Sequence, residues 1–206
     1  MGFYDKHILP RVINCACGTK PIMRQRSKVV PQASGTVLEI GIGSGQNLPY
    51  YDAARVERLI GLDPSQESWG LAAERAAHLD FDVEFIGLPG EQIPLEDASV
   101  DTVLVTYALC TIPDPIIALR GMARVLRPGG NLIFCEHGMA PDSRVRKWQD
   151  RINPFWRRVL GGCNLNRNIP QLLADGGFSV TDMDQMYLPN TPGFAGYNYW
   201  GTAQLP

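Results

Sequence analysis

The chain has 206 residues, of which 45% are hydrophobic and 19% are charged, and its formal net charge at pH 7 is −2. This length and composition are typical of one globular domain with a full hydrophobic core. The nearly balanced charge provides no general field for nucleic acid, so we expect no nucleic-acid partner. No apolar run approaches the length of a membrane span and no signal peptide is visible. We therefore expect a cytoplasmic protein without stable membrane insertion.

The cysteines are scattered along the sequence, at positions 15, 17, 110, 135 and 163. Cys15 and Cys17 are separated by one residue, whereas a redox or zinc pair has two residues between its cysteines. No second pair with nearby histidines completes a site. We therefore expect reduced thiols and no metal site.

Residues 1–34 form a leader before the first predicted strand. A rough helical stripe, interrupted by Pro10, is made by Phe3, Ile8, Val12, Ile13 and Ala16. A basic patch follows, made by Lys20, Arg24, Arg26 and Lys28. Two interpretations stay open: the leader packs as a lid over a ligand cleft, or it is a surface helix with a solvated basic loop. Its weak apolar face also allows peripheral contact with a membrane surface.

Residues 36–47, TVLEIGIGSGQN, change from an apolar run to a turn rich in glycine. The aliphatic residues at positions 37, 38 and 40 predict a buried parallel strand. A short helix with Pro49 in its first turn should follow. A strand, a glycine turn and a helix start bring backbone N–H groups close to a ligand, and glycine permits that approach.

The spacing of the glycines indicates which ligand is expected. A dinucleotide fingerprint would place its third glycine at position 46, which is Gln46 here. The pattern present, Glu39-x-Gly41-x-Gly43-x-Gly45, resembles motif I of the class I S-adenosylmethionine-dependent methyltransferases. By this resemblance Glu39 helps to hold the cofactor's ammonium group. The turn then passes beneath the methionyl and ribose parts and includes Gly41, Gly43, Gly45 and Asn47. A glycine turn without a ligand and an NAD(P) site are the alternatives.

A second strand over residues 58–62 ends at Asp63, which is 18 positions after Gly45. A Rossmann-type sheet places its ribose-binding carboxylate near this distance. The competing interpretation makes Asp63 the N-cap of a helix over residues 66–79, with Pro64 at its first position. We favour the ribose role and count Pro64 with the cofactor site.

Three further strands follow, with a loop after the first and a helix after the second. A strand over residues 83–86 leads to a loop that contains Glu91 and Gln92. By the resemblance, these two residues match the position that contacts the adenine ring. Their sequence alone is equally consistent with ordinary solvated loop residues. A strand over residues 101–106 ends at Thr106, which we assign to the cofactor site. A helix from Asp114 to Leu126, a stop at residues 128–130 and a strand over residues 131–136 come next. The repeated alternation predicts an α/β fold.

Residues 138–177 are predicted to be an insert on the substrate side. It contains a helix over residues 143–158, kinked or broken at Pro154, and a helix over residues 169–175. Apolar residues lie on one face of the first of these helices: Trp148, Ile152, Phe155, Trp156 and Val159. We interpret this face first as ordinary core and second as a substrate surface. Strands over residues 178–183 and 196–204 follow.

The resemblance implies one Rossmann-like class I methyltransferase domain over residues 35–206, with a seven-stranded, mostly parallel sheet, helices on both faces and a closing antiparallel hairpin.

The second half of the chain narrows the resemblance. The segments LCTI, RVLRPGG, CEHG, NPFW, GGCNLNR and GYNYWGTA together resemble the methyltransferase-like family of vertebrates that methylates alkyl thiols. That family has an apolar membrane anchor and a cysteine after its first motif glycine, and this sequence matches neither feature. Bacterial relatives are often labelled phospholipid N-methyltransferases. The resemblance implies methylation of a small-molecule thiol. The alternative is an N-methyltransferase that acts on a phospholipid or small amine. An NAD(P)-dependent oxidoreductase is the alternative that is not a methyltransferase.

Ligands of open α/β sheets bind at the carboxyl ends of the strands, which places Tyr107, Cys110, Glu136 and His137 near the transferred methyl group. We expect His137 to be the base or the group that orients the acceptor, although a histidine after a strand is often structural. Asn164 and Arg167 either bind a polar end of the acceptor or tie the insert to the core. Trp156 is the remaining residue that we assign to the acceptor.

Overall fold

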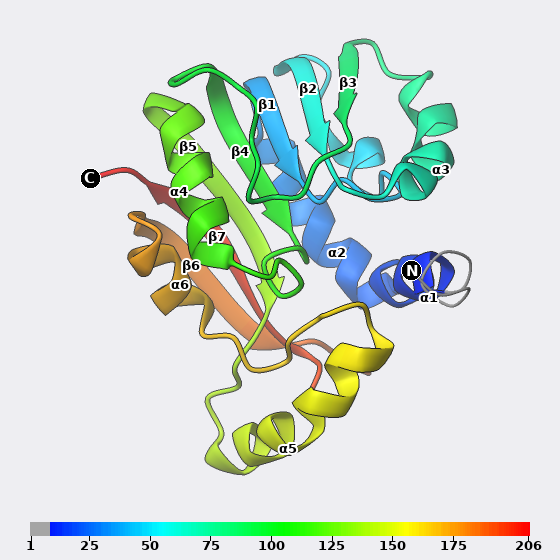
Figure 1. Cartoon of the computed structure of the whole chain (residues 1–206), viewed down its shortest axis with the longest axis vertical. Helices are drawn as coiled ribbons and strands as arrows, with labels where there is room; N and C mark the ends of the chain where they lie inside the picture. Colours follow the sequence, from blue (N-terminus) through cyan, green and yellow to red (C-terminus); the bar gives the residue numbers. More distant parts are fainter. Residues whose placement is uncertain (1–8) are drawn as a thin grey trace.

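The computed structural model describes residues 9–206, so Phe3 and Ile8 of the predicted stripe lie outside the described residues. Seven strands form one sheet in the order β3-β2-β1-β4-β5-β7-β6 (Figure 1). All neighbouring pairs are parallel except those of β7, which runs antiparallel to β5 and β6. The predicted fold class, with its closing antiparallel hairpin, is confirmed. The strands are β1 (Gly35–Ile40), β2 (Val56–Leu62), β3 (Asp82–Ile86), β4 (Val100–Thr106), β5 (Leu126–His137), β6 (Ser179–Tyr187) and β7 (Tyr197–Gln204).

Two hydrophobic clusters cover the two faces of this sheet because successive side chains of a strand point to opposite faces. On β5, Leu132 and Phe134 join a cluster with α4 (Pro115–Val125) and α6 (Ile169–Asp175). Ile133 and Cys135 join the other cluster, which contains residues of α2 (Lys20–Val29) and α3 (Gln66–Ala76). The central strands are therefore apolar on both faces, as parallel strands between helix layers require.

Several predicted boundaries were wrong. The strand β5 begins at Leu126, where the backbone leaves α4 and pairs with Val100, so residues 128–130 belong to the strand and do not separate it from the helix. The helix α3 ends at Ala76 and not at residue 79, whereas β6 extends to Tyr187. The helix α1 (Leu9–Cys17) is not interrupted by Pro10, because a proline at the start of a helix removes no intrahelical hydrogen bond.

The helix α5 (Ser143–Val159) runs through Pro154 without a break. Much of its apolar face is not core, because Trp148 and Phe155 are 54% and 70% exposed. Ile152 and Trp156 on the same face are half-buried. The helix stands apart from the sheet (Figure 1). Among the described residues, no helix has both the length and the apolar character needed to cross a bilayer.

The fully buried Gln149 attaches α5 to the rest of the domain. Its Oε1 accepts from Ala140 N at 2.9 Å, and its Nε2 lies 3.0, 2.9 and 3.1 Å from the carbonyl oxygens of Gly138, Leu165 and Phe194. A single amide thus satisfies backbone groups of three segments. Such groups cannot reach water in the interior and are costly when unpaired.

We expect Gln149→Leu to lower the free energy of unfolding by about 3 kcal/mol, because it leaves several buried backbone groups without partners. Urea denaturation measures the change. The matched variant Gln185→Leu, at an exposed position of β6, should change stability by no more than about 0.5 kcal/mol. Similar losses in the two variants would show that Gln149 has no special role.

Candidate functional site

The turn after β1 has the backbone that only glycine adopts easily. Gly41, Gly43 and Gly45 have φ angles of +74°, +49° and +71°. A Cβ atom on Gly41 would lie 2.6 Å from the Cβ of Ala108, so this glycine is required by packing. A Cβ atom on Gly43 would meet nothing closer than 3.9 Å. Gly43 is therefore the glycine of this turn where a Cβ atom would make only ordinary van der Waals contacts, so space is least restricted there.

Glu39 lies at the end of β1 and is almost completely buried. Its Oε1 accepts from Asn47 Nδ2 at 2.9 Å and its Oε2 from Tyr51 Oη at 2.7 Å. Burial raises the pKa of the Glu39 carboxyl above its usual value, although these two hydrogen bonds and the nearby Arg26 act in the opposite direction. Thr106, at the end of β4, accepts a second bond from Asn47 at 2.9 Å. The structure thus brings the predicted residues Glu39, Asn47 and Thr106 together.

Arg26 completes this network and was missed as a site residue. It leaves α2 for the interior, where Nη1 donates to Asn47 Oδ1 at 2.8 Å and to Thr106 Oγ1 at 2.6 Å. Only 6% of the residue is exposed, and its Nε is buried without a partner. Within the described part of the chain, no carboxylate forms a salt bridge with it. Nothing in the sequence separated Arg26 from the other basic residues of the leader.

Asp63 braces the glycine turn from the end of β2. Its Oδ2 accepts from Gly43 N at 3.0 Å and its Oδ1 from Ser65 N at 2.8 Å. The N-cap of α3 is Ser65, which accepts from Ser68 N, so the N-cap interpretation of Asp63 is wrong. Burial raises the pKa of Asp63, while the two backbone N–H groups oppose that rise. The adjacent Pro64 is exposed.

The remaining residues predicted to contact the cofactor lie outside this network. Glu91 accepts from Asp114 N at 3.0 Å and thus fixes the start of α4. Gln92 is exposed, and its backbone N–H donates to the Pro89 carbonyl. Their role at an adenine ring stays a prediction.

The leader packs against the glycine turn. Asn14 of α1 accepts from Ser44 Oγ at 2.6 Å and from Gln46 Nε2 at 2.8 Å. The basic residues belong to α2, and Arg26 is buried, so they do not form a solvated loop. Whether α1 and α2 open and close as a lid stays a prediction.

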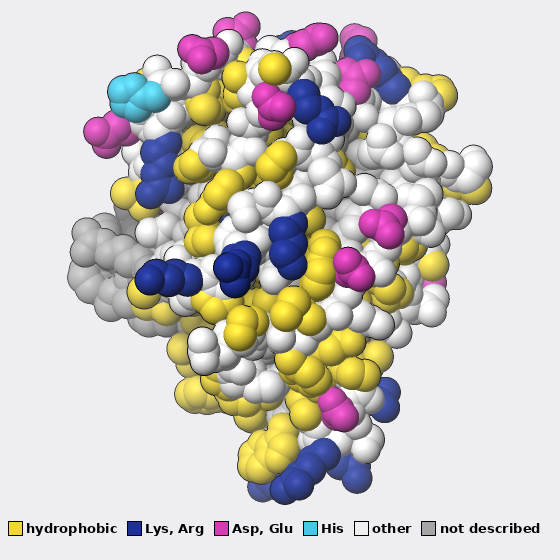
Figure 2. Space-filling model, turned by 180° about the vertical axis from the view of Figure 1, so that it is seen from behind, with side chains coloured by type: hydrophobic (Ala, Val, Ile, Leu, Met, Phe, Trp, Pro, Cys, Tyr) yellow, Lys and Arg dark blue, Asp and Glu magenta, His cyan; other side chains and the backbone are white. Residues whose placement is uncertain are grey.

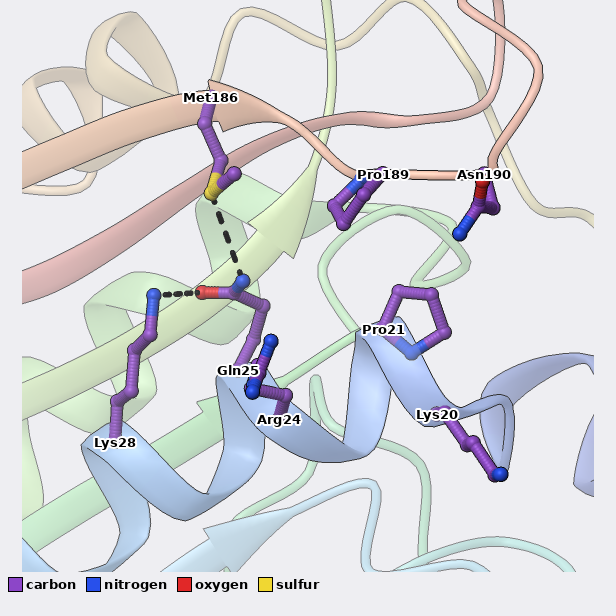
Figure 3. Close-up of a pocket in the computed structure, with 8 residues that line it drawn as sticks. All are labelled: Lys20, Pro21, Arg24, Gln25, Lys28, Met186, Pro189 and Asn190. Atoms are coloured by element: carbon purple, nitrogen blue, oxygen red, sulfur yellow. Dashed lines mark hydrogen bonds between the residues drawn. The ribbon is translucent and has the colours of Figure 1, made fainter.

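The outer face of α2 and the end of β6 enclose a groove of about 700 Å³ (Figure 3). It is lined by Lys20, Arg24 and Lys28 on α2 and by Met186, Pro189 and Asn190 opposite. Basic side chains cross this face of the molecule in a row (Figure 2). None of the predicted site residues lines this groove. The candidate site lies instead at the strand ends.

The loop after β4 is shaped by a buried carboxylate. Glu136 Oε1 accepts from the backbone N–H groups of Ala108 and Leu109 at 2.7 and 3.0 Å, and its Oε2 has no partner. Burial raises the pKa of Glu136, and the backbone donors oppose that rise. Tyr107 begins the loop at φ +53°, and its hydroxyl donates to Asn198 Oδ1 at 2.8 Å. Glu136 therefore holds the backbone that presents the predicted acceptor side.

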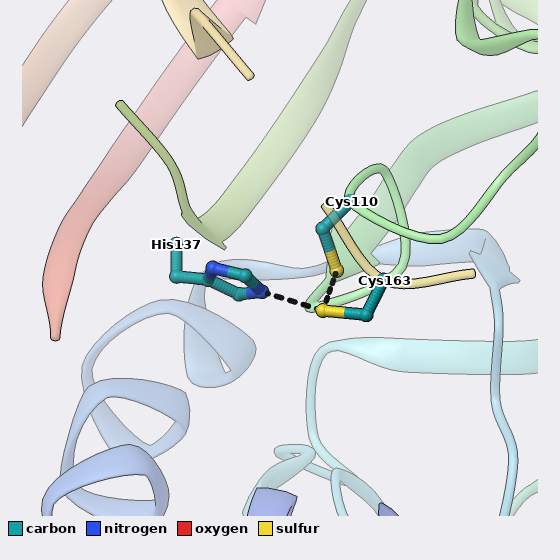
Figure 4. Close-up of side chains that lie close together, drawn as sticks. All are labelled: Cys110, His137 and Cys163. Carbon is teal, nitrogen blue, oxygen red and sulfur yellow. Dashed lines mark hydrogen bonds between the residues drawn. The ribbon is translucent and has the colours of Figure 1, made fainter. Parts of the chain in front are cut away.

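Cys110, His137 and Cys163 meet at the ends of β4 and β5 (Figure 4). His137 Nε2 lies 3.2 Å from Cys163 Sγ, which lies 3.8 Å from Cys110 Sγ. The hydrogen bond to Cys110 and burial raise the pKa of the Cys163 thiol above its usual value. Burial lowers the pKa of His137, but the Cys163 sulfur and the Glu136 carboxylate outweigh it, and the net shift is upward.

Asn164 and Arg167 contact the backbone of the same loop. Asn164 Nδ2 donates to the Cys110 carbonyl at 2.9 Å, and Arg167 Nη1 donates to the Leu109 carbonyl. These contacts match the prediction that they tie the insert to the core. Trp156 packs edge-to-face on Phe194 with ring centroids 5.9 Å apart, outside this group.

Comparisons with known proteins agree with this geometry. A protein-family profile described as "Methyltransferase domain" matches residues 38–134. The human thiol S-methyltransferases TMT1B and TMT1A are 35% and 33% identical over 76% and 77% of this chain. The chain spans 66% of the length of each of these relatives. A phosphatidylethanolamine N-methyltransferase of Cereibacter sphaeroides is 30% identical over 55% of this chain and 56% of its own length.

A solved structure of a geranyl diphosphate methyltransferase in complex with S-adenosylmethionine has the same fold, with a TM-score of 0.70 and 14% identity. The alignment covers 89% of this chain and 84% of that one. The chain belongs to the class I S-adenosylmethionine-dependent methyltransferases. S-adenosylmethionine is therefore the cofactor, which sets aside the nicotinamide alternative. The residues fit this group: the turn is least crowded at Gly43, and the Nε of the buried Arg26 has no hydrogen-bond partner.

We expect Asp63→Ala to weaken the binding of S-adenosylhomocysteine by about 1–3 kcal/mol, because a carboxylate that accepts from ribose hydroxyls would be lost. Isothermal titration measures the affinity, and Asp184→Ala on the exposed face of β6 is the control. Unchanged affinity in a folded Asp63→Ala protein would limit Asp63 to bracing the glycine turn.

Proposed function

We propose that this protein transfers the methyl group of S-adenosylmethionine to the sulfur of a small-molecule thiol. The observation that carries the proposal is the contact of the His137 imidazole with a thiol sulfur, Cys163 Sγ, at 3.2 Å. An imidazole that already contacts one thiol at the strand ends can contact the sulfur of an acceptor in the same way. The similarity to two thiol S-methyltransferases supports this choice of acceptor.

On the cofactor side, the residues around the glycine turn have distinct roles in this proposal. Arg26 pairs with the methionyl carboxylate through its unpartnered Nε. Backbone carbonyls and the Glu39 carboxylate at the end of β1 hold the ammonium. Asp63 accepts from the ribose hydroxyls. When bound, the cofactor supplies a methyl group already activated by the positive charge on its sulfur.

On the acceptor side, the protein has to place the nucleophile and remove its proton. A cysteine thiol has a pKa of about 8.5 and is mostly protonated at pH 7, and an unactivated alkyl thiol ionises even less. A nearby base therefore raises the fraction of thiolate. His137 Nε2 takes the proton from the acceptor sulfur and later releases it to solvent. Tyr107 and Cys110 line the acceptor side, whereas Trp156 packs on Phe194 outside it. In-line placement of the two reactants supplies most of the rate enhancement. Asn164 and Arg167 hold the loop that carries Cys110.

We expect His137→Gln to reduce turnover of a short alkyl thiol by about 10²-fold, because general-base catalysis contributes at least that factor. The affinity for S-adenosylhomocysteine should not change, since His137 lies away from the glycine turn. The same substitution at the exposed His78 is the control. Full activity of His137→Gln would remove the imidazole from the chemistry.

We expect Arg26→Met to weaken S-adenosylhomocysteine binding by about tenfold or more, because a charge-assisted hydrogen bond of about 1.5–3 kcal/mol is lost. Binding of methylthioadenosine, which has no carboxylate, should be nearly unchanged. Arg24→Met, on the exposed face of the same helix, is the control. An equal loss for both ligands would mean that Arg26 supports the fold of the site and does not pair with the carboxylate.

The class of acceptor is tested with hexanethiol, hexylamine and hexanol, which differ only in the nucleophilic atom. We expect release of S-adenosylhomocysteine with the thiol alone. Release with the amine alone would overturn the proposal in favour of N-methylation, for which the similarity to the phosphatidylethanolamine N-methyltransferase is the basis. Turnover of the alcohol would contradict both.

A further inference from the structure

The sulfur and nitrogen atoms of Cys110, His137 and Cys163 all lie within 4.8 Å of one another. Tetrahedral zinc has Zn–S bonds of about 2.3 Å and Zn–N bonds of about 2.0–2.1 Å, which places two sulfur ligands about 3.8 Å apart and sulfur and nitrogen about 3.5 Å apart. The two sulfurs are 3.8 Å apart, and His137 Nε2 is 3.2 Å from Cys163 Sγ. These two pairs are therefore within a few tenths of an ångström of the separations in a zinc site. The third pair, Cys110 Sγ and the His137 ring nitrogen, lies within 4.8 Å and has to close by up to about 1.3 Å to reach the sulfur–nitrogen separation of a zinc site.

The three side chains are held in place by contacts that do not involve their ligand atoms. His137 ends β5 and lies opposite Asn198 of β7 in the sheet. The Cys110 and Cys163 loops are joined at Asn164, whose backbone N and Nδ2 donate to the Cys110 carbonyl at 2.8 and 2.9 Å. A site whose ligands are positioned before binding loses little conformational entropy when the ion enters.

The chemistry of this set matches a soft cation. Thiolate and imidazole are the ligands that zinc prefers, and the buried Glu136 carboxylate next to His137 adds negative charge. Three protein ligands leave a fourth position for water or a small thiol. Because the members come from three distant segments, the sequence rule of closely spaced pairs does not detect them.

We propose that Cys110, Cys163 and His137 bind a thiophilic divalent cation, for which Zn²⁺ is the best fit, and that the bound cation inhibits methyl transfer. Binding forms two metal–sulfur bonds and one metal–nitrogen bond, releases the two thiol protons to solvent and changes no oxidation state. The nitrogen that ligates the cation is the Nε2 atom that removes the acceptor proton, so it cannot perform both roles. This inhibition rests on the proposed function, whereas the binding site itself does not.

Binding is tested on the full chain after reduction and removal of metal, by titration with Zn²⁺ and Co²⁺. We expect one equivalent per chain and a sulfur-to-cobalt charge-transfer band, with both lost in Cys110→Ser and Cys163→Ser and kept in Cys15→Ser, whose cysteine is exposed. Affinity for S-adenosylhomocysteine shows whether each variant is folded. If a variant does not fold, the wild-type cobalt spectrum decides, because absence of thiolate charge transfer excludes the site. Stoichiometric binding that persists in either folded serine variant would also overturn it.

Inhibition is tested by loading one equivalent of Zn²⁺, removing the excess and measuring hexanethiol methylation at several thiol concentrations, because the acceptor competes for the cation. We expect the rate to fall about tenfold or more, as loss of a general base implies, and to return when a chelator is added. Bound zinc with an unchanged rate would overturn the inhibition and leave thiol methylation standing. Zinc binding without thiol turnover by the metal-free protein would overturn the proposed function and leave the site standing.

Discussion

The proposed cofactor side of the site depends on the hydrogen bonds that the buried Arg26 guanidinium donates to Asn47 and Thr106. The guanidinium lies among the ends of β1 and β4 and is connected to the Glu39 carboxylate through the amide of Asn47. Taking a positive charge out of water is costly unless polar groups surround it, and here two side-chain oxygens accept from one of its nitrogens. The helix α2 thereby becomes part of the site although it precedes the sheet in the sequence.

The proposed acceptor side also depends on a buried charge that hydrogen bonds stabilise, here the negative charge of a carboxylate. Glu136 is fully buried at the end of β5. Backbone N–H groups of the loop after β4 donate to its carboxylate and offset part of the free energy needed to remove it from water. The loop is therefore fixed relative to the sheet, and Tyr107 is held in a backbone conformation that is uncommon for its residue type. The ring of Tyr107 lies 5.0 Å from the Arg26 guanidinium and 6.5 Å from the His137 ring, so it connects the two sides.

The insert contributes in a different way. Gln149 and Asn153 bind backbone groups around the loop that carries Cys163, so the position of α5 and the position of Cys163 are linked. At the same time, Trp148 and Phe155 are exposed on the outer surface of this helix. Helical periodicity identified that face as apolar, but periodicity alone does not distinguish a face that packs on the core from one that faces solvent.

The sequence by itself determined the α/β alternation, the glycine turn and the residues at the strand ends, because these depend on local patterns: buried strands, positive φ angles and helix starts. It did not determine the strand that begins at Leu126, because pairing with Val100 overrides the local signal of residues 128–130. Tertiary structure alone decided that Arg26 is buried and that Cys163 joins Cys110 and His137. Those contacts join segments up to 80 positions apart, and such distances are set by how helices pack on a sheet.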